Sequence, residues 1–155
     1  METLIATRPV INGQANPFIP EEGWKVLEHK EQEPFEWNPD LIETHLIDEQ
    51  KNGQNIKGYE MEKEVSLLDV CNASFLDDLI KFFQDNPDEI PACFKPTGNA
   101  HYQCNIFWGT IYINPNDKKF VRGLLVFKDG RPQGSYLPLD HLFSSSDPAV
   151  VFKKN

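Results

Sequence analysis

Three residues in one irregular segment, Cys93, His101 and Cys104, are of types that bind zinc and have the spacing C-x7-H-x2-C. Zinc in proteins is held by four ligands, which usually come as two closely spaced pairs. This segment has no C-x2-C pair and is one ligand short, although Cys71 or His141 could supply the fourth. A free cysteine is more often a small buried hydrophobic residue. The sequence therefore predicts no metal site, and zinc at these residues is the alternative.

The same cysteines and histidines are also the residue types of nucleophilic catalysis. A nucleophile needs a base to activate it and a third group to orient that base, and Asp140 stands beside His141. No local signature such as G-x-S-x-G surrounds any of these residues. A small enzyme or metal-binding protein with a Cys/His site around residues 93–104 and His141 is therefore the second hypothesis for function. No cofactor is expected.

Acidic clusters and nucleotide-binding motifs give weaker indications. Asp77 and Asp78 fall on the polar side of a helical pattern, where solvent keeps a carboxylate ionised. Neither G-x-x-x-x-G-K-[ST] nor G-x-G-x-x-G occurs in the chain. The segment 120–127 contains Arg122-Gly123, as RNA-recognition strands do, but leucines stand where such strands carry base-stacking aromatic residues. Nucleic acid is therefore not an expected partner.

Charge is unevenly distributed along the chain. The 155 residues carry a net charge of −9, with 20 acidic and 7 basic residues in 1–90 but 4 acidic and 8 basic residues in 91–155. An acidic chain is repelled by nucleic acid and by anionic membranes. No apolar run reaches the roughly 20 residues of a transmembrane helix. Three cysteines favour a reducing compartment over a disulfide framework, so we expect an acidic cytoplasmic protein without a membrane partner.

The predicted strand at 105–113 carries the best candidate binding surface. Alternation along a strand places Trp108 and Tyr112 on one face and the more aliphatic side chains on the other. Trp and Tyr combine a large apolar area with a polar tip, which is the composition of recognition surfaces. The candidate binding residues are therefore Trp108 and Tyr112. The alternative is that the N-terminal segment or residues 139–152 cover this face, because an apolar surface of this size is rarely bare.

Arg122 joins this candidate site only under one strand register. A four-residue turn at 114–117 would pair Ile113 with Lys118, which places Arg122 on the face opposite Trp108. A bulge of one residue would bring Arg122 and Trp108 to the same face. Gly109, in the middle of the strand, indicates a bulge or a close backbone approach.

Strands and helices that would position these residues follow from local patterns. Aromatic and β-branched runs with intervening turn residues predict three antiparallel strands, at 105–113, 120–127 and 133–137. Pro132 and Pro138 confine the third strand to an edge. Apolar periodicity and capping residues predict helices over 74–85 and from Asn38 to about Gly53, with shorter helical segments at 60–68, 140–143 and from Asp147.

Two regions follow from this organisation. Residues 1–23 contain prolines and glycines without an apolar period, which predicts an extended N-terminal arm that is ordered only where Phe18 or Ile19 finds a groove. Residues 24–155 are predicted to form a single α+β domain. Its expected architecture is an antiparallel meander of three strands, or slightly more, with amphipathic helices packed on one face.

Several short motifs follow one another between residues 37 and 151 and together form a recognisable pattern. They are Asn72-Ala73-x-x-Leu76-Asp77, Pro87-Asp88-x-Ile90-Pro91, Phe107-Trp108-Gly109-Thr110-Ile111-Tyr112, Val121-Arg122-x-Leu124 and Asp147-Pro148-Ala149-Val150. This pattern resembles a group of small bacterial proteins with no known function. The resemblance implies a bacterial single-domain protein and carries no activity or site. The leading hypothesis is thus a non-enzymatic bacterial protein-interaction module that uses its acidic helical half or its aromatic sheet face against another protein.

Overall fold

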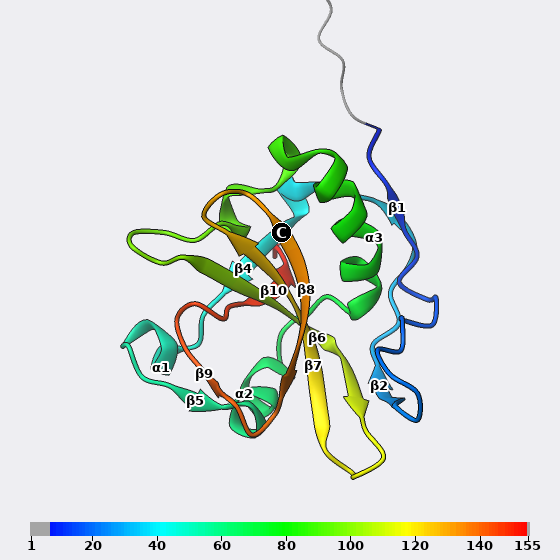
Figure 1. The fold of residues 1–155 in the computed structure, drawn as a ribbon, viewed down its shortest axis with the longest axis vertical. Coiled ribbons are helices and arrows are strands. Elements are labelled where there is room, and N and C mark those ends of the chain that lie inside the picture. Colours follow the sequence, from blue (N-terminus) through cyan, green and yellow to red (C-terminus); the bar gives the residue numbers. More distant parts are fainter. Residues whose placement is uncertain (1–6, 155) are drawn as a thin grey trace, which may run out of the picture.

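A six-stranded mixed sheet organises the α+β fold, which confirms the predicted class. The computed structural model describes residues 7–154 (Figure 1). No helix within these residues has the length and apolar character needed to cross a bilayer. In chain order the elements are β1 (Val10–Ile11), β2 (Lys25–His29), β3 (Phe35–Glu36), β4 (Ile42–His45), α1 (Asp48–Lys51), β5 (Ile56–Lys57), α2 (Gly58–Val65), α3 (Ala73–Asp85), β6 (Tyr102–Ile113), β7 (Lys119–Phe127), β8 (Pro132–Pro138), β9 (Leu142–Phe143) and β10 (Ala149–Phe152).

The central strand of the sheet is β6. It pairs with β7 along one edge, and β8 follows antiparallel to β7. Its other edge is shared between β10, which is parallel to it at Ile106, and β2, which is antiparallel to it near Thr110. Between these two partners, Gly109 donates its N–H to the carbonyl of Cys71 at 2.9 Å. A Cβ on Gly109 would lie 2.8 Å from the backbone of Asn72, so the predicted close backbone approach is confirmed.

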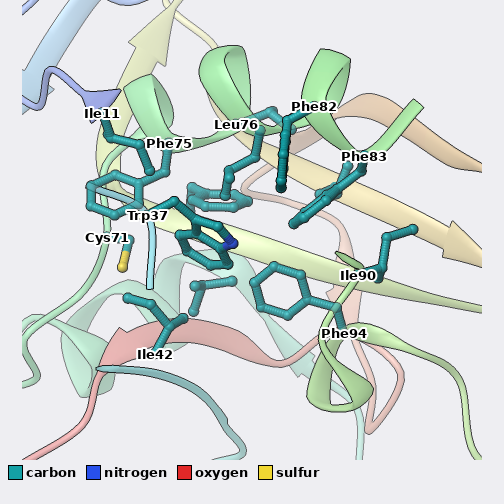
Figure 2. Close-up of a cluster of buried hydrophobic side chains, with 14 of the residues drawn as sticks. Ile11, Trp37, Ile42, Cys71, Phe75, Leu76, Phe82, Phe83, Ile90 and Phe94 are labelled. Atoms are coloured by element: carbon teal, nitrogen blue, oxygen red, sulfur yellow. The ribbon is translucent and has the colours of Figure 1, made fainter. Parts of the chain in front are cut away.

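Helix α3 covers one face of the sheet and forms the larger core with it. The predicted helix at 74–85 is confirmed, and Asn72 caps it by accepting the N–H of Ser74 at 3.0 Å. Its buried stripe packs on Phe107, Leu124 and Val126 of the sheet. Figure 2 shows Trp37 at the centre of this core, and its indole ring lies 6.1 Å from the ring of Phe83.

A second core lies on the opposite face of the sheet. Met61 and Val65 of α2 pack there with Ile106, Trp108 and other sheet residues. Helices α3 and α2 therefore lie on opposite sides of the sheet, as Figure 1 also shows. The expectation that all helices pack on one face is wrong for this reason. Both faces of the sheet are apolar, so each needs its own cover.

Three segments with helical signals form strands, although the first of them also contains the short helix α1. Asn38 caps only one turn of 3₁₀ helix, and Ile42–His45 then form β4 against β10. The predicted helical segments at 140–143 and from Asp147 are wrong as well, because Leu142–Phe143 and Ala149–Phe152 pair as strands. In all three segments the residues pair with strands far away in sequence, and these pairings override the local helical signals.

The described part of the N-terminal arm is more firmly held than the sequence predicts. Val10–Ile11 form β1 against β3, and the side chain of Ile11 is fully buried in the larger core. The carbonyl of Gly13 accepts hydrogen bonds from Nδ2 of Asn72 at 2.9 Å and from the N–H of Gln32 at 3.3 Å. The arm is therefore anchored well before Phe18.

Candidate functional site

The β6–β7 register decides which candidate residues share a face. Ile113 pairs with Lys119, and Tyr112 with Phe120, one residue beyond the pairing expected from a four-residue turn. The register then shifts by more than a one-residue bulge: Phe107, five residues before Tyr112, pairs with Arg122, only two residues after Phe120. Because alternate residues of a strand share a face and paired residues lie together, the side chains of Tyr112, Phe120 and Arg122 lie on the face covered by α3.

Arg122 is a buried charged residue on the sheet face that α3 covers. Its guanidinium forms an ion pair with Asp77 of α3, and the two side chains are 6% and 26% exposed. Burial by itself lowers the pKa of Arg122, but the charge and hydrogen bond of Asp77 outweigh this effect and the net pKa is raised. The arginine is therefore a permanent cation at the junction of α3 and the sheet.

The N-terminal arm passes over this ion pair. The N–H of Phe18 donates to Oδ2 of Asp77 at 2.8 Å, and the hydroxyl of Tyr112 donates to the carbonyl of Phe18 at 3.1 Å. Tyr112 is fully buried, and this burial raises the pKa of its hydroxyl to about 12. Tyr112 thus binds the arm and has no surface to offer to a partner.

Four aromatic side chains gather at the surface above Arg122, and we name them the aromatic patch: Phe18, Trp24, Phe120 and Tyr136. The rings of Trp24 and Phe120 lie 4.4 Å apart, and those of Trp24 and Tyr136 lie 6.1 Å apart. Cζ of Arg122 lies 5.7 Å from the ring centre of Phe18 and 5.2 Å from that of Tyr136, so both rings make cation–π contacts with it. Phe18 is 57% and Tyr136 37% exposed.

Trp108 lies on the other side of the sheet. It is 5% exposed and packs against Phe143, at 5.4 Å between ring centres. The expectation that Trp108 and Tyr112 form one exposed face is therefore wrong. The alternative, in which residues 139–152 and the arm cover these side chains, describes the structure. Arg122 shares the face of Tyr112 because Tyr112 pairs with Phe120, two residues from Arg122. The register shift within β6 turns Trp108 to the opposite face.

The cysteine candidates are divided between the two faces of the sheet. Cys93 packs against the larger core, whereas Cys104 belongs to the core on the opposite face. Within residues 7–154 no three His, Cys, Asp or Glu side chains are grouped closely enough to hold a metal ion. The alternative ligand set of Cys93, His101 and Cys104 is therefore not assembled.

Two residues of the Cys/His hypothesis, Cys104 and His141, do lie at one place in the structure. Cys104 and His141 both line a pocket on the face opposite α3, together with Ser135. Sγ of Cys104 lies 3.6 Å from Oγ of Ser135, and burial raises the pKa of the Cys104 thiol to about 12. A thiol with this pKa stays protonated at neutral pH, so Cys104 is not activated as a nucleophile.

Three members of the aromatic patch were missed by sequence reasoning. Trp24 and Tyr136 belong to segments with weak patterns, and the pattern around Phe120 predicts only a strand. For Phe18 the sequence predicts order only where the side chain finds a groove. The usable signal was the same-face spacing of Phe120 and Arg122, two residues apart on one strand.

Comparisons with known proteins add nothing to this geometry: no family model, no curated protein and no solved structure matches the chain. The resemblance of residues 37–151 to a group of small bacterial proteins therefore stays a prediction.

Proposed function

We propose that the chain is a non-enzymatic protein-interaction module of the bacterial cytoplasm that binds another protein through the aromatic patch. One observation carries this proposal: aromatic side chains from the arm, β7 and β8 meet at the surface over one buried arginine. Aromatic and arginine residues concentrate binding energy at protein interfaces. An apolar surface that is also rigidly supported is typical of a recognition site.

The ion pair below the patch makes it rigid. Arg122 is held by Asp77, and Asp77 in turn holds the backbone of Phe18. A partner therefore meets side chains whose positions are already set, which lowers the entropic cost of binding.

Charges beside the patch indicate the chemistry of the partner. Glu21 and Glu22 lie between Phe18 and Trp24 in the sequence and are exposed. Neither forms a salt bridge with another residue in 7–154. A partner that places an apolar side chain on the aromatic patch and a lysine or arginine near these glutamates would gain both contacts. We therefore expect a partner surface that is apolar with a basic rim.

Site-specific photo-crosslinking in the native cells tests this proposal. Benzoylphenylalanine replaces Phe18, which keeps an aromatic ring in the patch, and in a second strain replaces Leu67 as a control. Leu67 is 87% exposed and follows α2, the helix on the opposite face of the sheet. Irradiation should give one dominant crosslinked partner at position 18 and none of that species at position 67.

Two results would contradict the proposal. Equal crosslinking at positions 18 and 67 would show that the aromatic patch is not the binding surface. If position 18 crosslinks only to a second copy of the chain, the aromatic patch mediates self-association and does not bind a different protein.

A further inference from the structure

A pocket of about 360 Å³ lies on the face of the sheet opposite the aromatic patch. Leu125 and Leu137 form its apolar walls, and the exposed side chains of Tyr102 and Leu142 stand at its mouth. Its residues come from β6, β7, β8 and the segment that follows β8. A concave, mostly apolar pocket with a few polar groups is the usual form of a small-molecule site.

One of the residues that line the pocket carries a carboxylate. Asp147 is 8% exposed and lines the pocket. Its Oδ2 accepts the N–H of Ser144 at 2.8 Å and the Ser144 hydroxyl at 3.3 Å, which leaves Oδ1 as an acceptor. Within residues 7–154, no lysine, arginine or histidine nitrogen lies within 4.0 Å of this carboxylate.

A buried carboxylate without a cation is unusual, because the charge loses its hydration and gains no ionic partner. Burial accordingly raises the pKa of Asp147, although the Ser144 hydrogen bonds and the nearby His141 act in the opposite direction. His141 also lines the pocket, but its side chain is exposed at the rim. A bound cation would give the Asp147 carboxylate the ionic partner that it lacks among residues 7–154.

We propose that this pocket binds a small molecule with an apolar body and a protonated primary amine, the amine pairing with Asp147. The apolar body would lie between Leu125 and Leu137, and the ammonium would donate to Oδ1 of Asp147. An anionic ligand would be repelled by the same carboxylate. This site is separate from the aromatic patch, because Ser135 in the pocket and Tyr136 in the patch point to opposite faces of β8.

Phenethylamine and phenethyl alcohol are matched probes for the proposed site. They have the same apolar body and similar size, but only the amine is charged at pH 7.5. Titration calorimetry on the full-length protein at low salt should show binding of the amine at least about tenfold tighter than binding of the alcohol. Asp147→Asn keeps an oxygen for the Ser144 hydrogen bonds and removes the charge, so it should abolish this difference.

A second variant keeps the test decisive if Asp147→Asn fails to fold. Ser135→Leu places a larger side chain in the pocket from an edge strand and should abolish binding of phenethylamine. Gln133→Leu, on the same face of β8 but outside this pocket, is its control and should leave binding unchanged. Equal affinities of amine and alcohol, or amine binding that survives Ser135→Leu, would overturn the proposal. Neither result would bear on the aromatic patch.

Discussion

Arg122 of β7 and Asp77 of α3 form a largely buried ion pair that joins the main helix to the sheet. The same aspartate accepts the N–H of Phe18 in the N-terminal arm. Three parts of the chain that are distant in sequence thus meet at one carboxylate. The aromatic patch lies directly above this junction, because Phe18 and Tyr136 both contact the guanidinium.

Removing Asp77 should destabilise the fold strongly. Asp77→Ala leaves the guanidinium of Arg122 buried without its counter-ion, and we expect a loss of about 2–4 kcal/mol in the free energy of unfolding. Asp85→Ala makes the same change at an exposed position of α3 and should cost no more than about 0.5 kcal/mol. Urea denaturation measures both values. Equal effects of the two substitutions would mean that the ion pair contributes nothing.

The arm should contribute to stability before residue 15. Ile11→Ala removes a fully buried side chain and should cost about 2–5 kcal/mol, whereas Val10→Ala, at an exposed position of the same strand, should change stability little. Deletion of residues 2–15 should accordingly lower the thermal midpoint. An unchanged midpoint for the deletion and for Ile11→Ala would show that β1 is dispensable.

Gly109 should tolerate no side chain. A Cβ at this position would lie 2.8 Å from the backbone of Cys71 and Asn72, so Gly109→Ala must displace main chain. Gly134→Ala is the matched control, because its Cβ would make only ordinary contact at 3.5 Å with Ile80. We expect Gly109→Ala to reduce the yield of folded protein, and circular dichroism melts compare the two variants. Similar melting of both would contradict the close approach.

The cysteine thiols should react slowly in the native protein. Burial raises the pKa of all three, that of Cys104 to about 12, so the reactive thiolate is scarce at pH 8. Iodoacetamide followed by mass spectrometry should label half-buried Cys93 first, and Cys71 and Cys104 only after unfolding. Rapid alkylation of native Cys104 at pH 7 would instead support the Cys/His hypothesis of an enzyme.

Local signals in the sequence predicted the elements whose structure is decided locally. The cap at Asn72 and the apolar stripe that follows it specify α3, and the aromatic, β-branched run before Ile113 specifies β6. Strands β4 and β10 could not be predicted in this way. They exist because they pair with each other across about a hundred residues, and that pairing overrides helical signals at Asn38 and Asp147.

The site depended on a register that the sequence does not reveal. Asp117 adopts a φ of 63°, a left-handed conformation uncommon for a residue other than glycine, and the turn gains one residue. This turn pairs Tyr112 with Phe120 and so places Arg122 on the face of Tyr112, and the register shift between Phe107 and Tyr112 turns Trp108 to the other face. A one-residue change in register exchanges the faces of a strand, so the composition of the site was predictable only in part.

Quantitative co-purification from extracts of the native cells tests the central claim most directly. The bait is the full-length protein, with Phe18→Ser and Tyr136→Ser as patch variants and Leu67→Ser as the control at an exposed apolar position elsewhere. Thermal melts first establish that all three variants are folded, because Tyr136 is only 37% exposed and contacts Arg122. We predict one partner that is enriched by the unmodified protein and by Leu67→Ser, and that is reduced at least about tenfold by either patch variant. If Phe18→Ser and Tyr136→Ser enrich that partner as strongly as the unmodified protein does, binding through the aromatic patch is contradicted.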